Sequence, residues 1–567
     1  MAPERFIIME TIKIFCENTS LEHEVPMGTN LKDMVPDNGR TLAVLVDNKL
    51  KSLDYKVISP HNVRFLDYSH PDGRRTYIRS LCFVLQKVVH DMYPDKVLSV
   101  DYSLPSGLYC EVRERRHLDD GRPQVYFLTD DELAEISVRM RALVEADLPF
   151  TKQMLPLDTA SAMFEERGQT EKACLLRSIG RFNYNVYWLD GLADTFYGPL
   201  TTSTGLLTVF DIFGFNDGFL LQYPMDGESG KVHSMKRQSK LAKALAEHSD
   251  WCAMIGVKGV GALNRKVQSG GIIDLINLSE ALHERKYADI ADRIYERRGS
   301  VKIVFIAGPS SSGKTSTSKR LAIQCRILGL NPKVIELDNY FVDRELTPRD
   351  ENGDYDFEAL GAMDLKFLGQ QLNELLDGME VEIPRFDFKT GKRYFKGDMM
   401  QLHEKDILIM EGIHALNPAM IPGVDASKVF RVYASALTSL SIDENNNIST
   451  SDNRMLRRII RDNRTRGIMP EETIMRWQSV RRGENRNIFP FQENADALFN
   501  SAHIFELPVL KYYAEPLLRR ISPNSPAYTE ASRLLKFLDY IVALSPSEIA
   551  AIPPTSILRE FISGQTL

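Results

Sequence analysis

Eight residues at positions 308–315 have the types and order that bind the phosphate groups of a nucleotide. They end in Gly313, Lys314 and Thr315, and the apolar run 303–307 leads into them. Glycines allow backbone N–H groups to turn inward around an anion, and a helix that starts at the same point adds its positive end. The lysine then reaches the terminal phosphates, and the threonine hydroxyl holds Mg²⁺. We therefore predict a phosphate-binding loop, in preference to a Gly/Ser-rich turn without that role.

A buried strand and a helix must position such a loop. The apolar run before it reads as the strand, and residues 316–328 have helical spacing that Gly329 and Pro332 end. Strand and helix then alternate along the chain, which is typical of a parallel sheet with helices on both faces. We therefore expect a doubly wound α/β domain around the loop.

Two carboxylates stand where later strands of this sheet should end. Asp338 closes the predicted second strand at 333–338, and Glu411 follows the apolar run 407–410. Ligands in open parallel sheets lie at the carboxyl ends of the strands. We therefore expect both side chains beside the loop, where Glu411 would direct Mg²⁺ directly or through water.

Length and composition limit the other possibilities. A chain of 567 residues is too long for one hydrophobic core, so several domains are expected. The net charge of -7 gives no global attraction to nucleic acid or anionic membrane, so any such binding must be local. The six cysteines are scattered, without a C-x-x-C pair, which favours free thiols in a reducing compartment. Without a bilayer-length apolar run or a targeting segment, the sequence predicts a cytoplasmic protein with no membrane partner.

The first 70 residues read as a small α+β unit of short strands, turns and one short helix. This pattern resembles the TGS module, a β-grasp domain at the front of threonyl-tRNA synthetases and some ribosome-associated GTPases. The resemblance implies a β-grasp fold for residues 1–70.

Residues 71–230 resemble the second amino-terminal domain of threonyl- and alanyl-tRNA synthetases, which removes wrongly attached amino acids. The likeness depends on segments at 92–94, 104–109, 164–168 and 196–200. That family's site uses an H-x-x-x-H pair and a C-x-x-x-H pair. The corresponding positions are filled by side chains that cannot serve as these ligands: Arg79, Phe83, Phe196 and Leu200. The resemblance therefore implies a retained fold without the editing chemistry, used either as an RNA-contacting face or as a scaffold.

Two further segments read as helical. Residues 231–298 form a predicted connector with a glycine-rich interruption at 256–271, and residues 511–567 form a predicted tail that packs on the domain before it. No ligand spacing or binding motif occurs in the connector.

The most specific resemblance covers about residues 303–508. The loop at 308–315, with 338–341, 363–364, 384–388 and 411–413 and an arginine-rich helix at Arg454, looks like uridine kinase, within the uridine kinase/phosphoribulokinase branch of P-loop kinases. The whole chain resembles bacterial uridine kinase-like proteins that carry synthetase-derived domains. The implied fold class is α/β: a P-loop NTPase doubly wound parallel-sheet kinase domain at 299–510, preceded by α+β β-grasp and synthetase-like domains.

The resemblance implies ATP- and Mg²⁺-dependent transfer to the primary hydroxyl of a nucleoside. Asp338 would take the proton from the acceptor hydroxyl and, with Thr315 and Glu411, face the metal. The loop positions implied to hold ATP are Gly308, Ser310, Ser311, Ser312, Gly313, Lys314, Thr315 and Ser316. The acceptor would contact Asp338, Tyr340, Asp364, Arg385 and Phe386, although Asp364 can also be read as a helix N-cap.

Two acceptor positions depart from the family. Phe386 stands where the family has a tyrosine that contacts the base, and Gly391 stands where it has a base-reading histidine. Without this hydrogen-bonding pair, pyrimidine selection is not supported by contacts, so uridine is only the first substrate to try.

The arginine-rich helix resembles the family's lid over the phosphates. Guanidinium groups bind phosphate oxygens bidentately and remain charged while negative charge migrates during transfer. The lid residues include Arg458 and Arg461, which with Lys314 and Asp338 are the implied catalytic set, and three implied ATP ligands, Arg454, Arg457 and Arg466. A solvated basic helix or an RNA-facing patch is the alternative. Ile468 stands where the family often has a further arginine.

Three functions remain open from the sequence. The first is a nucleoside kinase, and the second is an RNA- or ribosome-associated ATPase switch in which the synthetase-like half contacts RNA. The third is a phosphoribulokinase-like sugar-phosphate kinase, which Arg349 and Arg385 leave open. A small nucleoside-like acceptor, an RNA contact through the N-terminal domains and a homodimer are the partners to test.

Overall fold

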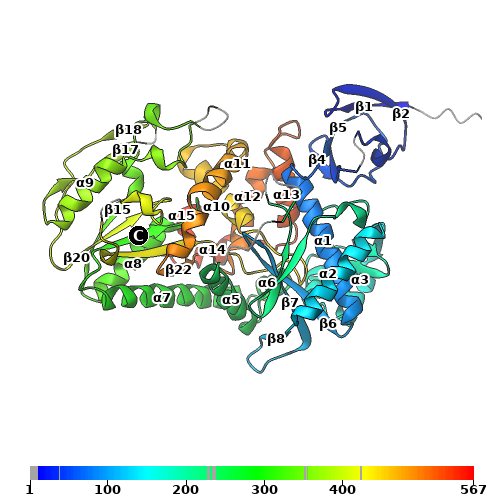
Figure 1. The fold of residues 1–567 in the computed structure, drawn as a ribbon, viewed down its shortest axis with the longest axis horizontal. Helices are drawn as coiled ribbons and strands as arrows, with labels where there is room; N and C mark the ends of the chain where they lie inside the picture. Colours follow the sequence, from blue (N-terminus) through cyan, green and yellow to red (C-terminus); the bar gives the residue numbers. More distant parts are fainter. Residues whose placement is uncertain are drawn as a thin grey trace, which may run out of the picture.

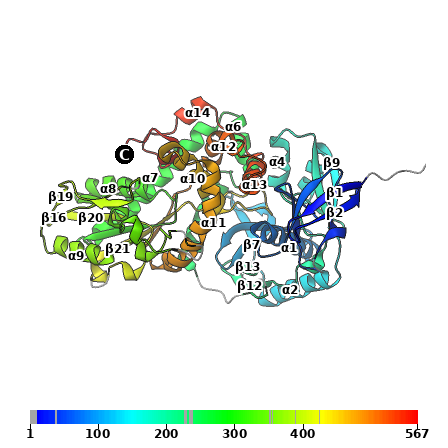
Figure 2. The same cartoon turned by 90° about the horizontal axis from the view of Figure 1, so that it is seen from above.

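A computed structural model describes residues 11–36, 39–225, 230–232, 238–349, 353, 355–387, 389–421 and 424–567. Figure 1 shows a small blue sheet at one end of the molecule and a green and yellow sheet domain at the other. Figure 2, seen from above, places the orange and red helices α10 to α13 between these ends. Within the described residues, no helix is long and apolar enough to cross a membrane.

The first sheet has five strands in the order β2-β1-β5-β3-β4. Its strands are β1 (Thr11–Cys16), β2 (Leu21–Pro26), β3 (Ala43–Val46), β4 (Lys49–Lys51) and β5 (His61–Leu66). In β1 exposed and buried residues alternate, because successive side chains of a strand point to opposite faces. β1 pairs in parallel with β5 and antiparallel with β2. The short helix η1 (Leu31–Met34) closes the hydrophobic core of this unit.

The second unit contains two antiparallel sheets with helices against them. One sheet has the order β12-β13-β7-β6, with β8 paired to β7, and the other has the order β11-β10-β9. The strands are β6 (Lys96–Leu104), β7 (Gly107–His117), β8 (Pro123–Tyr126), β9 (Thr151–Pro156), β10 (Asn183–Leu189), β11 (Leu192–Asp194), β12 (Asp211–Phe215) and β13 (Gly218–Gln222). The helices are α1 (Pro71–Met92), α2 (Asp130–Glu145), α3 (Leu157–Glu166) and α4 (Thr170–Ser178). Most of α1 is buried, so this helix is the centre of the unit.

Three helices lead from this unit to the last domain: α5 (Ser239–Met254), α6 (Val260–Gln268) and α7 (Ile272–Glu296). The helix α6 occupies the segment that the sequence predicted to be a glycine-rich interruption. Some glycines of this segment flank α6, as Gly256 and Gly270 do with positive φ. Another lies where α6 closely approaches α4. A Cβ on Gly261 would lie 2.5 Å from the backbone N of Leu175, so glycine here permits α6 to pack on α4.

The C-terminal domain contains a five-stranded, fully parallel sheet in the order β15-β20-β14-β21-β22. Its strands are β14 (Ile303–Ala307), β15 (Asn331–Glu336), β20 (Asp406–Glu411), β21 (Val429–Ser435) and β22 (Ala497–Asn500). The main helices around it are α8 (Lys314–Ile327), α9 (Leu365–Leu376), α10 (Thr450–Arg466) and α11 (Pro470–Asn487). Two small hairpins add β16 (Val381–Glu382), β17 (Arg385–Asp387), β18 (Lys392–Tyr394) and β19 (Met399–Met400). The predicted doubly wound α/β fold is confirmed.

The last segment joins distant parts of the molecule. It contains α12 (Glu506–Leu518), α13 (Tyr528–Leu538), α14 (Pro546–Ala550) and α15 (Arg559–Ile562). Near its middle, the Thr529 hydroxyl donates to the carbonyl oxygen of Asn48 in the first unit (3.1 Å). Its end lies at the opposite side of the molecule, beside α8, where Lys319 donates to the carbonyl oxygen of Leu567 (3.0 Å; Figure 1). The segment thus contacts both the first unit and the start of α8.

Candidate active site

The loop between β14 and α8 has the geometry of an anion cradle. Ser311 and Gly313 have positive φ values of 59° and 79°, which turn the backbone sharply before α8 begins. A Cβ on Gly308 would lie 1.9 Å from the carbonyl oxygen of Ala434, so only glycine fits at the end of β14. The N-terminus of α8, with its positive end, therefore borders the loop.

Lys314, Thr315 and Glu411 meet at this loop. The Thr315 hydroxyl donates to Glu411 Oε1 (2.6 Å), and Lys314 Nζ donates to the carbonyl oxygen of Pro309 (3.3 Å). Burial raises the pKa of Glu411 to about 7, and the positive charge of Lys314 opposes this shift. The strand ends thus bring Glu411 to the loop as the sequence pattern predicts.

The oxygen atoms at this point fit Mg²⁺. A hydroxyl and a carboxylate in contact are hard oxygen donors, and Mg²⁺ is usually bound through one or two carboxylates together with water and substrate phosphates. Among the described residues, no group of three or more His, Cys, Asp or Glu side chains forms a metal cage. Thr315 and Glu411 are therefore the side chains that would hold the ion.

Asp338 lies in the field of three cations. It belongs to the short helix η3 (Leu337–Tyr340) that directly follows β15. Burial raises the pKa of Asp338, while the charges of Lys314, Arg466 and Arg461 oppose the shift. These three cations come from the loop and from α10. The strand-end carboxylate is therefore under the electrostatic influence of the loop lysine and of two arginines of the predicted lid.

Two arginines of α10 contact the backbone of the loop from the protein interior. Arg454 pairs with Glu484 (Nη2 to Oε2, 2.8 Å) and donates to the carbonyl oxygen of Ser310 (3.1 Å). Arg457 pairs with Glu506 and donates to the carbonyl oxygen of Ser501 (2.9 Å). Both guanidinium groups are fully buried. This geometry gives no support for their predicted contact with ATP. Because both side chains are held by buried carboxylates, we interpret them as braces of the loop.

The remaining lid arginines surround the buried carboxylate of Asp462. Its carboxylate accepts from Arg458 (3.2 Å) and Arg461 (2.8 Å), with Arg466 at 3.5 Å. These cations lower the pKa of Asp462 against the effect of burial. Arg458 also donates to the Ser310 hydroxyl at the loop (2.9 Å). The roles of Arg458, Arg461 and Arg466 on phosphate remain predictions.

The end of the chain covers the start of α8. Glu560 Oε2 accepts from the backbone N–H of Ser316 (3.2 Å) and from its hydroxyl (2.5 Å). Gln565 Nε2 donates to the same hydroxyl (2.7 Å). Ile557 packs on Gly313, where a Cβ would lie 2.5 Å from Ile557 Cδ1. A carboxylate of the chain itself thus takes an anion position at the helix N-terminus, where the predicted Ser316 contact with ATP would form.

The predicted acceptor residues fall into two groups. Asp364 caps α9 through the N–H of Phe367 (3.1 Å) and accepts from Arg393 with its other oxygen (3.0 Å). The N-cap interpretation is therefore shown, and a sugar contact stays a prediction. Tyr340 is fully buried and donates to Gln371 (2.9 Å). Its ring and hydroxyl are both used in the core, so the structure gives no support for an acceptor contact by Tyr340, which stays a prediction.

Arg385, Phe386 and Gly391 lie at the hairpin of β17 and β18. Arg385 donates to Asp398 (2.8 Å), and the Phe386 ring meets the Phe341 ring edge-on at 5.7 Å. Gly391 has a φ of 72°, and a Cβ there would lie 2.7 Å from Arg344 Cβ. A histidine would not fit at position 391 with this backbone. The absence of a base-reading histidine therefore follows from the conformation of the hairpin.

Glu358 and His414 lie at this site without having been singled out in the sequence. Burial raises the pKa of Glu358 to about 7; the charges of Glu484 and Asp338 raise it further, and those of Arg458 and Lys314 oppose the shift. Glu358 Oε2 has no hydrogen-bond partner among the described residues. Burial lowers the pKa of His414 to about 4, so its imidazole is neutral beside Lys314. Neither residue follows a motif, and only the folded chain shows their position.

The four substituted editing positions also meet in space. Phe83 and Phe196 are buried with their rings 5.3 Å apart, and Leu200 lies in the same hydrophobic core. Arg79 donates to the carbonyl oxygen of Pro199 (2.7 Å). Apolar packing and one guanidinium group thus fill the place that the resemblance assigned to a metal or hydrolytic site.

The chain resembles known proteins of two kinds, kinases and threonine–tRNA ligases. Residues 303–506 match the phosphoribulokinase/uridine kinase family. A uridine kinase of Macrococcus caseolyticus is 30% identical over 197 residues, which are 35% of this chain and 86% of the relative. A threonine–tRNA ligase of Symbiobacterium thermophilum is 26% identical over 223 residues, 38% of this chain, but these span only 33% of the ligase. A solved D-glycerate 3-kinase of Cryptococcus neoformans aligns with 43% of this chain and 87% of its own at 15% identity, with a TM-score of 0.20.

Proposed function

This chain belongs to the phosphoribulokinase/uridine kinase family, and from that membership we propose that it transfers the terminal phosphoryl group of ATP to the primary hydroxyl of a nucleoside or related ribosyl compound. The products are the monophosphate and ADP. The observation that carries the proposal is the geometry of the phosphate loop at Lys314, Thr315 and Glu411, with Asp338 in the electrostatic field of Lys314. A switch ATPase does not need a carboxylate at this point to receive an acceptor proton.

Each of these groups has a distinct task in phosphoryl transfer. Lys314 binds the terminal phosphates, and Asp338 orients the acceptor hydroxyl and receives its proton as the new P–O bond forms. Arg458 and Arg461 neutralise the charge that moves toward the leaving phosphate. When bound between Thr315 and Glu411, Mg²⁺ supplies further charge neutralisation at the phosphate oxygens.

The acceptor side favours recognition of hydroxyl groups over recognition of a base. Glu358 presents a buried carboxyl oxygen without a partner among the described residues, and it lies in the field of Lys314 and Asp338. A protonated or shared carboxyl can donate to and accept from ribose hydroxyls. Gly391 leaves no side chain to read a base edge. We therefore propose a ribosyl acceptor whose sugar is recognised more strictly than its base.

A screen of nucleosides and other ribosyl compounds tests this function. We expect ADP formation to depend on an added acceptor and mass spectrometry to identify the matching monophosphate. Steady ATP hydrolysis that needs no acceptor, and that RNA increases, would contradict the kinase and support the switch.

The C-terminal segment should lower the affinity for ATP. Since Glu560 holds the N–H and hydroxyl of Ser316, we expect Glu560→Gln to tighten ATP binding by roughly tenfold, the effect of removing one charged competitor worth about 1.4 kcal/mol. Titration with a fluorescent ATP analogue measures this. Glu548→Gln is the matched control, because Glu548 only caps α14 through Ser545. Equal or weaker binding by the Glu560 variant would show that its carboxylate does not compete with the nucleotide.

We expect transfer to require the Mg²⁺ site of the C-terminal half and to require no zinc in the N-terminal half. We expect EDTA to abolish transfer and Mg²⁺ to restore it, because Thr315 and Glu411 offer oxygen donors only. A zinc-selective chelator should leave the rate unchanged, because Arg79, Phe83 and Phe196 stand at the aligned ligand positions. Elemental analysis checks the second point: stoichiometric zinc in the purified protein would contradict our alignment of the N-terminal half.

A further inference from the structure

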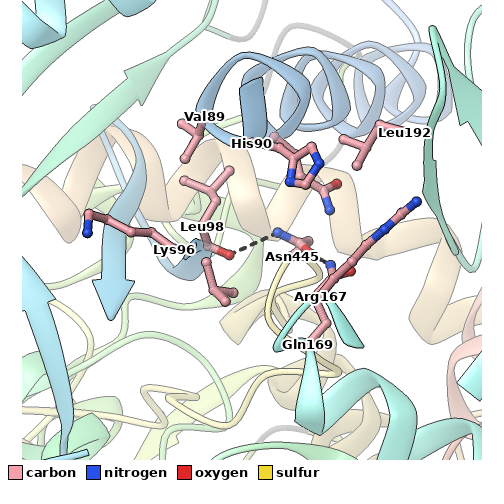
Figure 3. Close-up of a pocket in the computed structure, with 10 residues that line it drawn as sticks. Val89, His90, Lys96, Leu98, Arg167, Gln169, Leu192 and Asn445 are labelled. Carbon is pink, nitrogen blue, oxygen red and sulfur yellow. Dashed lines mark hydrogen bonds between the residues drawn. The ribbon is translucent and has the colours of Figure 1, made fainter. Parts of the chain in front are cut away.

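The segment that leads into α10 is held by the synthetase-like unit. Asn445 donates to the carbonyl oxygen of Leu98 (3.0 Å) and accepts from Gln169 (2.8 Å), as Figure 3 shows. The Glu444 carboxylate accepts from the backbone N–H groups of Glu171 (2.7 Å) and Lys172 (3.0 Å) at the start of α4. The cavity in Figure 3 has a volume of only about 20 Å³, enough for about one water. These contacts join the N-terminal half to the helix that braces the phosphate loop.

A larger cavity lies beside this junction. Its volume is about 220 Å³, and residues of both halves line it. Arg75 and Arg79 come from α1, Arg533 comes from α13, and Asn447 and Ser449 come from the segment before α10. The wall is therefore rich in guanidinium, amide and hydroxyl groups.

Two of the three guanidinium groups are already neutralised. Arg533 makes a bidentate pair with Asp452 (2.7 Å for both bonds) and donates to Glu530 (3.0 Å). Arg75 donates to Asp72 (2.7 Å) and approaches Glu530 at 3.1 Å. These two arginines pair with three carboxylates, of which Glu530 contacts both, so they form a complete network in the wall of the cavity.

Arg79 differs from its neighbours. Only 9% of the residue is exposed, yet no carboxylate lies within ion-pair distance of it among the residues that the structure describes. It donates to the carbonyl oxygen of Pro199 (2.7 Å) and lies over the Tyr197 ring at 4.9 Å. Gly198 makes room for it, since a Cβ there would lie 2.5 Å from Arg79 Nη1. Burying a charge without a counterion is costly, so this geometry suits an anion from outside the chain.

Other positive groups act at the same place. The N-terminus of α10, capped by Ser449, borders the cavity, and a helix N-terminus favours negative charge. Burial lowers the pKa of Lys536 in α13, and the charges of Lys51, Arg79 and Lys152 lower it further against Asp72. Lys536 thus lies within the electrostatic field of Arg79.

We propose that this cavity binds a compact polar anion, carrying a phosphate or carboxylate group together with hydroxyl groups, and that its occupancy controls the nucleotide site through α10. Arg79 pairs with the anion, and Asn447 and the residues at the start of α10 contact its polar groups. The anion binds the N-terminal half and the start of α10 together, so it favours one position of that helix. Arg454 and Arg457 transmit this position to the carbonyl groups of the loop. The control rests on the proposed kinase function, whereas the binding does not.

Binding is tested with ribose 5-phosphate and with malate as separate probes on the full chain. Calorimetry and thermal unfolding compare the wild type with Arg79→Gln and with Arg139→Gln, which removes an exposed guanidinium from α2 of the same unit. We expect one probe to bind and to raise the unfolding temperature, the Arg79 variant to lose at least about tenfold in affinity, and the Arg139 variant to match the wild type. Ile78→Phe, which fills the cavity from α1 without touching the charge, should also lose binding.

Control is tested by measuring the affinity for a fluorescent ATP analogue with and without the bound probe. A coupled pair of sites must show the same factor in both directions, so ATP must change the probe's affinity equally. The site is overturned if neither probe binds to a folded wild type. It is also overturned if the Arg79 and Ile78 variants bind the probe as tightly as the wild type does. Binding with no change in nucleotide affinity overturns the control and leaves the site. Binding and coupling in a protein that phosphorylates no acceptor would contradict only the proposed function.

Discussion

Asp338→Asn is expected to leave ATP binding nearly unchanged and to lower the rate of transfer by about 10²- to 10⁴-fold. The carboxylate lies after β15, where the charges of Lys314, Arg461 and Arg466 act on it. Asparagine keeps the shape and can orient a hydroxyl, but it cannot receive the proton. The loss should therefore appear in kcat, with little change in the KM for ATP.

Single-turnover phosphoryl transfer, measured beside equilibrium binding of a fluorescent ATP analogue, separates these effects. Glu345→Gln is the matched control, because this exposed carboxylate belongs to the next short helix, η4 (Arg344–Leu346). We expect that variant to behave as the wild type. Unchanged transfer by Asp338→Asn would remove Asp338 from the reaction, and a large loss of ATP affinity would assign it to nucleotide binding instead.

Local sequence signals were sufficient for the fold and for the strand-end groups of the site. The run 303–307, the glycines of the loop and the helical spacing after Thr315 all depend on neighbouring residues, and the structure has β14, the loop and α8 in that order. The carboxyl ends of parallel strands share one edge of a sheet, which is why Asp338 and Glu411 could be placed at the loop before any coordinates were known.

The arginines of α10 show where local reasoning stops. Spacings of three and four put them on one broad face, which suggested one common role. The structure divides them because Glu484 and Glu506, 30 and 49 residues further along, reach Arg454 and Arg457. No pattern within the helix contains that information. The same holds for Glu560, which lies 244 residues after Ser316 in the chain.

The glycines between residues 256 and 271 also predicted the end of helical structure less well than expected. Several glycines predict an interruption if each one breaks a helix. In the structure they border α6 or permit its contact with α4, as for Gly261. Whether a glycine ends a helix or lets it pack closely depends on the partner element, which the local sequence does not show.

Arg457→Met is expected to lower the free energy of unfolding of the C-terminal domain by about 3–5 kcal/mol, because it leaves the buried Glu506 carboxylate without its partner. Arg457 and Glu506 are both almost fully buried, and Arg457 also reaches the carbonyl oxygen of Ser311 (3.5 Å). Nucleotide binding should weaken as a consequence, because the loop loses this brace. Arg461→Gln should show the opposite pattern, with a large loss of transfer and little loss of stability, since Asp462 keeps Arg458 and Arg466 as partners.

Denaturant titration can follow this domain through Trp477, which is buried at α11 beside Arg454. Replacing the other two tryptophans, Trp188 and Trp251, by phenylalanine in all variants isolates its signal. If Arg457 acts through its buried pair, Arg457→Met combined with Glu506→Met should recover part of the stability that the single change removes, since no uncompensated charge remains. An Arg457→Met protein as stable as the wild type, with transfer lost, would instead make Arg457 a phosphate ligand of the lid. The double variant therefore decides between a brace and a ligand at a position where the helix pattern alone allows both.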